Sequence, residues 1–392
     1  MAGSHDVSVA GSPGARAIVW LRPDQAGLVR AACASAGLQV VGAGGPGRSG
    51  VESSAALDVP VVSSLRDALL EGACDVLWLH APDTNDDALD HAHESMLARA
   101  VARGVRVATT EPLPTSLLDS DAPALFAGEP GAPRLARVPG AWSDDLARDL
   151  GESLGAFGRA RAGSIESLCA PRHGSLALAL MHAIELALAL VGPPEAIDAV
   201  YTQGDAPAGL HTLPSETLAD LSGTISAVLR YADGRGLTLL ASDASGAWSR
   251  RVELIGPAGV LRHTGDAWSW TDREGRTVDS STPEHEPPEP VAKPSLAKKG
   301  RRPADDGLFD ARTSATETST TKAGTTEAGA TPPPLDTAHA LFAEALRLLV
   351  RGAWPLPVTD RVTPLAVAQA ALLSARTGNA ESPETMRRLS RR

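Results

Sequence analysis

The sequence has 392 residues, more than one ordinary hydrophobic core accommodates, so two domains with connecting segments are expected. Its formal charge of −11 comes from scattered acidic residues, which argues against nucleic acid or an anionic membrane as a partner. The three distant cysteines suggest neither a disulfide framework nor a zinc site, and no metal site is predicted. Because neither a signal peptide nor a membrane-spanning apolar run is recognisable, the sequence predicts a cytoplasmic protein.

After a flexible leader over residues 1–14, short apolar runs alternate with helical patterns. The apolar runs lie at 17–21, 38–43, 60–64, 75–82 and 105–110, and the helical patterns at 24–37, 65–72 and 85–104. Strands that are apolar along their whole length and alternate with helices are typical of a parallel sheet covered on both faces. Residues 15–120 are therefore predicted to form a Rossmann-like, doubly wound α/β domain.

The pattern then changes to strands in which apolar and polar residues alternate. They lie at 159–167, 196–204, 221–232, 236–244, 249–256, 259–265 and 267–272, with one very apolar helix at 174–192. This pattern predicts an α+β domain, a mostly antiparallel sheet with packed helices, over residues 121–282 and 335–380.

Two segments fall outside these domains. Residues 283–334 are rich in Pro, Ser, Thr, Ala, Glu and Lys, a composition that buries too little apolar surface to order itself, so a disordered insertion is predicted there. Helices are expected to resume at 335–352 and 362–378, and residues 381–392 are predicted to be a tail.

Several strings resemble one family of enzymes when they are taken in order. They are 75-DVLWLHAP-82, 110-TEP-112, 155-GAFG-158, 178-LALMHAIE-185 and 249-SRRVELIGPAGVLR-262. Together they resemble the glucose-fructose oxidoreductase, inositol dehydrogenase and MocA-like (Gfo/Idh/MocA) family over nearly all of the chain predicted to be ordered. The resemblance implies an oxidoreductase that uses NAD or NADP on a sugar, cyclitol or related polyol.

The resemblance also carries candidate site residues. The catalytic candidates are His182 as acid and base, Glu111 at the position of the family's motif lysine, and Glu185 one helical turn after His182. The cofactor-binding candidates, which follow from position alone, are Leu21, Arg22, Asp24, Gln25, Arg48, Ala81, Pro82 and Thr110.

The cofactor turn departs from the family's pattern. A dinucleotide-binding turn needs glycines because its backbone approaches the pyrophosphate closely, whereas this chain has 21-LRPDQAG-27. Pro23 lacks an N–H donor and Asp24 adds a negative charge, which together argue against binding of NAD or NADP. After the second strand, Arg48 and the glycines of 42–47 are interpreted either as a 2′-phosphate loop or as a flexible surface loop.

The catalytic positions depart from the pattern as well. A glutamate cannot stabilise an alkoxide as a lysine does, and Leu178 replaces the family's aspartate four residues before His182. His182 is therefore either a catalytic group or a structural histidine in an apolar helix.

Three functional hypotheses follow. The main one is a protein that has lost hydride transfer and serves as a non-catalytic partner or small-ligand binder, as a homo-oligomer or paired with an active relative. The alternative is an active NAD(P)-dependent oxidoreductase, and a third is a regulatory binder of a nucleotide or sugar phosphate through Arg48.

Overall fold

The computed structural model describes the parts of the chain that carry both predicted sheets, all within one compact unit. These parts are residues 14–71, 73–81, 91–117, 135–140, 153–203, 212–219, 221–264, 267–281, 338–351 and 362–389. The predicted leader, apart from its last residue, and the predicted insertion at 283–334 lie outside them, so both stay predictions.

The first sheet is parallel and has five strands in the order β2-β1-β3-β4-β5, as a Rossmann-like domain requires. Its strands are β1 (Ala15–Trp20), β2 (Leu38–Gly44), β3 (Val76–Leu79), β4 (Arg106–Thr109) and β5 (Leu135–Arg137). The short 3-10 helix η1 (Pro23–Gln25) and α1 (Ala26–Ala36) follow β1, and α2 (Ser49–Leu57), α3 (Leu65–Glu71) and α4 (His91–Ala102) complete the domain.

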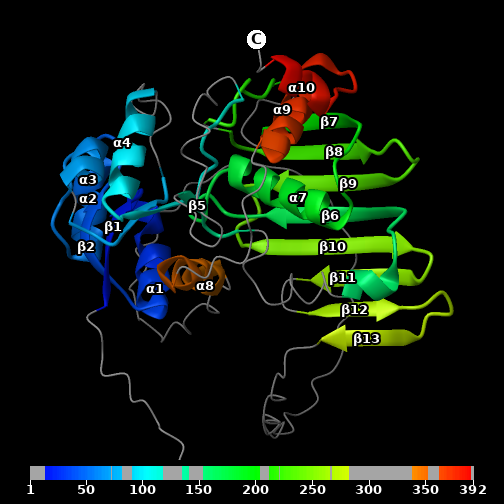
Figure 1. Cartoon of the computed structure of the whole chain (residues 1–392), viewed down its shortest axis with the longest axis horizontal. Helices are drawn as coiled ribbons and strands as arrows, with labels where there is room; N and C mark the ends of the chain where they lie inside the picture. The colour runs from blue at the N-terminus through cyan, green and yellow to red at the C-terminus, as the bar shows by residue number, and fades with distance from the viewer. Residues whose placement is uncertain are drawn as a thin grey trace, which may run out of the picture. The chain divides into compact units, whose positions relative to one another are not determined.

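Helices cover both faces of this sheet, which explains why its strands are apolar throughout (Figure 1). Alternate side chains of β1 point into two separate cores. Val19 packs in a cluster with residues of α1, whereas Ile18 and Trp20 pack in a second cluster with residues of α3 and α4. The predicted doubly wound arrangement is confirmed.

The second sheet has eight strands in the order β13-β12-β11-β10-β6-β9-β8-β7. Its strands are β6 (Ala162–Leu168), β7 (Ala196–Thr202), β8 (Thr224–Arg230), β9 (Gly236–Ser242), β10 (Ser249–Gly256), β11 (Gly259–Thr264), β12 (Trp268–Thr271) and β13 (Thr277–Ser281). All neighbours pair antiparallel except β6 and β9. The helices α7 (Leu176–Leu190) and α9 (Val362–Thr377) cover one face, so the predicted mostly antiparallel sheet with packed helices is confirmed (Figure 1).

Some elements differ from the predictions. The parallel sheet continues past residue 120, because the three-residue strand β5 pairs with β4. The segment 60–64 forms only an isolated bridge between Val61 and Ala43. Residues 49–57, for which no helix was predicted, form α2. The predicted tail contains α10 (Pro383–Leu389), which packs against α9.

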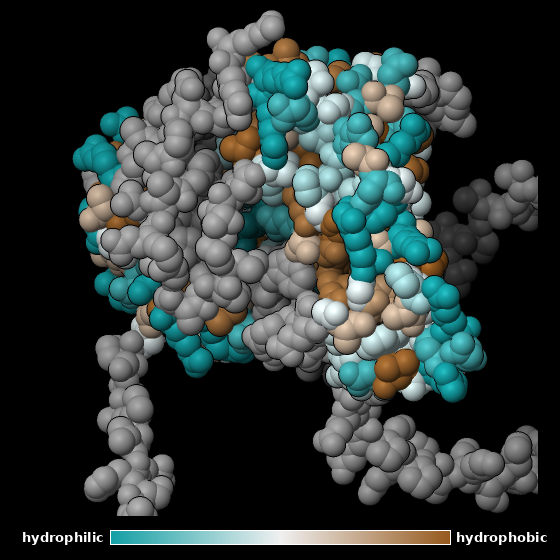
Figure 2. All heavy atoms as spheres, turned by 45° about the vertical axis from the view of Figure 1, so that its right-hand side comes forward, coloured by the Kyte–Doolittle hydropathy of each residue, from teal (hydrophilic) through white to brown (hydrophobic). Residues whose placement is uncertain are grey.

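The helix α8 (Ala338–Arg351) returns the chain to the parallel sheet, although the sequence assigned it to the second domain. It packs against α1 and β4, and its buried Phe342 lies 5.7 Å from Trp78 of β3, measured between ring centroids. None of the helices in the described part of the chain is long and apolar enough to span a membrane. Figure 2 shows hydrophilic and hydrophobic residues interspersed on the face that it presents.

Candidate functional site

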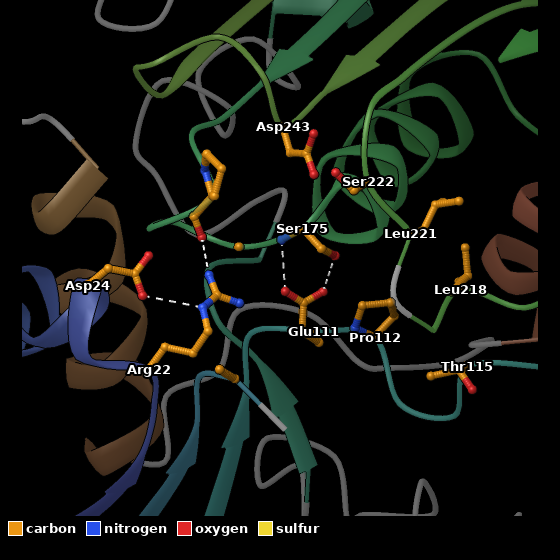
Figure 3. Close-up of a pocket in the computed structure, with 13 residues that line it drawn as sticks. Arg22, Asp24, Glu111, Pro112, Thr115, Ser175, Leu218, Leu221, Ser222 and Asp243 are labelled. Carbon is orange, nitrogen blue, oxygen red and sulfur yellow. Dashed lines mark hydrogen bonds and ion pairs between the residues drawn. The ribbon is translucent and has the colours of Figure 1, made fainter. Parts of the chain in front are cut away.

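A cavity of about 380 Å³ lies at the carboxyl ends of β1, β3 and β4. Residues near the start of α7, at the approach to β8 and after β9 complete its lining, and Figure 3 shows how their side chains lie. Ligands of open α/β sheets bind beyond the carboxyl ends of the strands, so this cavity is the candidate site. Its charged groups are Arg22, Asp24, Glu111 and Asp243.

Arg22 extends from the turn after β1 to the segment that precedes α7. Its guanidinium donates a hydrogen bond to the carbonyl oxygen of Pro171 at 2.6 Å, and its Nε lies 3.3 Å from Oδ1 of Asp24 (Figure 3). Arg22 and Asp24 therefore balance each other's charge at one side of the cavity.

The backbone of this turn is already hydrogen-bonded. The N–H of Leu21 donates to the carbonyl of Gly44 at 3.0 Å, and the N–H of Arg22 donates to the side-chain oxygen of the buried Gln25 at 2.8 Å. The N–H of Gln25 donates to the carbonyl of Arg22, and Pro23 has none to offer.

The loop after β2 lies directly against the end of β1. A Cβ atom added at Gly45 would stand 2.2 Å from the carbonyl oxygen of Leu21, and the hydroxyl of Ser53 donates to that same oxygen at 3.0 Å. The glycines that the sequence analysis assigned to a phosphate loop or a flexible loop therefore allow a close approach of two backbone segments.

Glu111, at the end of β4, accepts hydrogen bonds at both carboxylate oxygens. The backbone N–H of Ser175 donates to Oε1 at 2.8 Å, and the Ser175 hydroxyl donates to Oε2 (Figure 3). Ser175 is also the N-cap of α7, because its hydroxyl accepts from the N–H of Ala177. Burial raises the pKa of Glu111 above its ordinary value, and the hydrogen bonds from Ser175 act in the opposite direction.

The sequence matches no family model and no curated protein, so the comparison rests on structure. The myo-inositol 2-dehydrogenase of Lactobacillus plantarum superimposes with a TM-score of 0.58 at 16% identity, covering 94% of this chain and 99% of that one. The scyllo-inositol dehydrogenase of Lactobacillus casei gives 0.59 at 13% identity, covering 96% and 100%. A levoglucosan dehydrogenase in complex with NADH and L-sorbose gives 0.58 at 14% identity, covering 95% and 99%.

The chain has the Gfo/Idh/MocA fold. The resemblance predicted from the sequence strings thus holds at the level of architecture. Sequence identities this low show the Gfo/Idh/MocA fold alone, and the chemistry has to be argued from the residues of this chain.

His182, the acid and base expected from the Gfo/Idh/MocA resemblance, is fully buried in α7 and is not among the residues that line the cavity. Its Nε2 hydrogen-bonds the carbonyl oxygen of Pro139 at 2.8 Å, so Nε2 carries the proton. Its ring also packs edge-on against Trp248, with centroids 5.4 Å apart. Burial lowers the pKa of His182 to about 4, so the imidazole is neutral at pH 7.

The other predicted residues are divided between the cavity and the core. Glu185 forms an ion pair with Arg137 of β5. The Thr110 hydroxyl accepts from the indole of Trp78 at 3.0 Å and hydrogen-bonds Nδ1 of His80 at 2.6 Å. Neither Glu185 nor Thr110 lines the cavity.

Among the cofactor candidates, Arg22, Asp24 and Ala81 line the cavity, whereas Leu21 and Gln25 are buried beneath it. Arg48 is the N-cap residue of α2, is exposed and does not line the cavity. Pro82 lies outside the described residues.

Ser175 and Asp243 are among the cavity residues that the sequence did not identify as candidates. Ser175 immediately precedes an apolar helix, and that N-cap pattern would have identified it. Asp243 follows β9 and is 5% exposed, with Oδ1 accepting from the N–H of Gly223 at 2.8 Å. No local motif marks Asp243, because the groups around it come from distant parts of the chain.

Proposed function

We propose that this protein binds a small molecule in the cavity and does not transfer hydride. The observation that carries the proposal is the role of Glu111. In the family that the chain resembles, a lysine at this position stabilises the charge on the reacting oxygen, whereas here a carboxylate holds the start of α7 through two hydrogen bonds. A negative charge in that place opposes the formation of an alkoxide.

The turn after β1 supports the proposal, because its residues do not fit a dinucleotide. Pyrophosphate binding at a helix N-terminus uses free backbone N–H groups and glycines without a Cβ in the way. Here the N–H groups of Leu21, Arg22 and Gln25 are engaged within the protein, and Asp24 adds negative charge. We therefore propose that neither NAD nor NADP binds in the manner of the dehydrogenases with this fold.

The position of His182 also supports the proposal. A general base must lie within hydrogen-bond reach of the proton that it abstracts, and its pKa should lie near the working pH. His182 is fully buried, with Nε2 bonded to Pro139 and a pKa of about 4. The buried Trp248 on one side of its ring adds a further barrier between the imidazole and water.

The first test is a fluorescence titration with NADH and NADPH, since Trp20 ends β1 beside the turn. We expect no saturable quenching and no energy transfer to the nicotinamide at cofactor concentrations up to the millimolar range. A panel of sugars, cyclitols and polyols with either oxidised cofactor should give no reduction detectable by absorbance. Saturable quenching together with substrate-dependent reduction would overturn the proposal.

A second candidate is an active NAD(P)-dependent oxidoreductase on a sugar, cyclitol or polyol. The observation that favours it is the levoglucosan dehydrogenase of the same fold, whose structure contains NADH and L-sorbose. Activity would require a proton acceptor other than His182, and among the carboxylates of the cavity Glu111, at the position of the family's motif lysine, is the candidate. Loss of all turnover in a Glu111→Gln variant would identify it in that role.

We also propose that the protein works in the cytoplasm as a homo-oligomer or together with an active relative. Its free cysteines Cys33 and Cys169 are buried thiols, which suits a reducing compartment. On the sheet face opposite α7 and α9, Val200, Val228 and Ile255 are exposed, an arrangement that suits a protein contact. Light scattering after size exclusion should give a mass above that of one chain, and a monomer at all concentrations would contradict the homo-oligomer.

A further inference from the structure

The cavity carries more negative charge than its own cation balances. Arg22 is the basic residue of the lining, and its guanidinium is engaged by Asp24 and by the carbonyl of Pro171. Two carboxylates of the lining, Glu111 and Asp243, have no ion pair with any described residue. A pocket with this balance favours a ligand of positive charge.

Asp243 gives the clearest indication of a missing partner. Asp243 is 95% buried, and its Oδ1 accepts a hydrogen bond from the N–H of Gly223. Within the described part of the chain, no group donates a hydrogen bond to Oδ2, and Figure 3 shows the carboxylate directed toward Ser222 and Ser175. Oδ2 therefore remains open to the cavity, where it is suited to a donor on a ligand.

Glu111 stands at the same cavity and interacts electrostatically with Asp243. Burial raises the pKa of Glu111 above its ordinary value, the bonds from Ser175 and the charge of Arg22 lower it, and the charge of Asp243 raises it further. Burial raises the pKa of the Cys169 thiol, and the charges of Glu111 and Asp243 raise it further, so the thiol stays protonated and contributes no charge. A cation between the two carboxylates would relieve their repulsion.

We infer that the cavity binds a small hydroxylated molecule through a cationic nitrogen, an ammonium or a guanidinium, held between Glu111 and Asp243. This inference rests on the proposed ligand-binding function and specifies the chemical class of the ligand. The hydroxyls of Ser222 and Thr115 in the lining suit the hydroxyl groups of such a ligand, and about 380 Å³ accommodates a molecule of monosaccharide size.

Two other occupants fit less well. A metal ion needs several oxygen, nitrogen or sulfur ligands converging on one point, and the described residues contain no group of three His, Cys, Asp or Glu side chains placed to hold one. A phosphate would need a free cation, whereas Arg22 already has two partners and two further carboxylates face the cavity.

The test uses two pairs of molecules that differ mainly in charge: glucamine against sorbitol, and glucosamine against glucose. Binding is measured by isothermal titration calorimetry and by saturation-transfer NMR on the full-length protein. We expect the cationic member of at least one pair to bind about tenfold or more tightly than its neutral counterpart. Equal binding of both members, or binding of the neutral member alone, would overturn the inference and leave the ligand-binding function in place.

Two variants test whether the tighter binding of the cationic molecule takes place in the cavity. Asp243→Asn removes the charge but keeps an acceptor for the N–H of Gly223, and it should weaken binding of the cationic probe about tenfold or more. Glu274→Gln, in the exposed turn between β12 and β13, is the matched control and should bind like the wild type. If both variants weaken binding of the cationic probe equally, the inference is overturned. If none of the four molecules binds, the result counts against both the inference and the ligand-binding function.

The pH dependence supplies an independent readout. A bound cation stabilises ionised Glu111, so affinity for glucamine should rise as the pH increases through the raised pKa of that carboxyl. The other titratable groups about the cavity are Arg22, Asp24, Asp243 and Cys169. Circular dichroism checks that each variant is folded. In Glu111→Gln the rise should disappear, and an unchanged rise would contradict the role of Glu111.

Discussion

A carboxylate at the amino end of a helix stabilises that helix, and Glu111 does this for α7 from the segment that follows β4 of the parallel sheet. The residue at the position of the family's motif lysine therefore has a structural role in this chain. Hydrogen bonds to a charged acceptor are among the stronger ones in proteins, so this contact is expected to contribute measurably to stability.

The substitution Glu111→Lys introduces the residue type of the family motif. A lysine cannot accept from the N–H and hydroxyl of Ser175, so we expect the free energy of unfolding to fall by about 1–3 kcal/mol. We also expect no dehydrogenase activity, because the turn after β1 stays unchanged. Urea unfolding and an NAD(P)H absorbance assay measure the two effects.

The control for that prediction is Glu111→Gln, which keeps an acceptor for the N–H of Ser175 and should lose less stability. Robust turnover in the lysine variant alone would refute the argument from the turn. A lysine variant as stable as the wild type would refute the stabilising role of the hydrogen bonds from Ser175 to Glu111.

At the scale of elements, the loop after β2 approaches the end of β1 so closely at Gly45 that a side chain does not fit there, whereas Gly27 of α1 has open space around it. Gly45→Ala should destabilise the protein, because its Cβ would stand 2.2 Å from the carbonyl oxygen of Leu21. Gly27→Ala in α1 should stabilise it by up to about 1 kcal/mol, since a Cβ there meets nothing within 4 Å and alanine favours a helix. Melting temperatures that shift in opposite directions would confirm the distinction, whereas an unchanged melting temperature for Gly45→Ala would contradict the close approach.

Much of the architecture at this scale could be predicted from the sequence. The alternation of fully apolar strands with helices identified β1 to β4, and apolar–polar alternation identified β6 to β12. The strand β5 was missed because three residues carry no periodicity, and α2 because its Ser- and Ala-rich sequence has no apolar stripe. The candidate site was only partly predictable, since Asp243 is brought to Glu111 by tertiary structure and not by any local pattern.

At the scale of the whole molecule, two buried histidines couple folding to pH. Burial lowers the pKa of His80 to about 3 and that of His182 to about 4. In the unfolded chain each histidine has its ordinary pKa of 6.5. The unfolded state therefore binds more protons than the folded state below pH 6.5. Stability is fully present above that pH and is lost as the pH falls toward the folded values.

We accordingly predict that the free energy of unfolding decreases between about pH 6.5 and pH 4, by up to about 1.4 kcal/mol per pH unit for each histidine. Urea unfolding at a series of pH values measures the slope. His182→Gln removes one titrating group and should make the slope shallower. An identical slope in that variant would show that His182 titrates alike in both states.

The hydrogen bonds from Ser175 to Glu111 also bear on which substitutions this position tolerates. If the protein does not transfer hydride, as proposed, a lysine at position 111 would lower folding stability at once, while any gain of activity would need further substitutions in residues 21–26. Single-residue changes toward the family motif would then pass through less stable proteins without the activity. The contact between Glu111 and Ser175 therefore favours retention of the glutamate on grounds of folding stability.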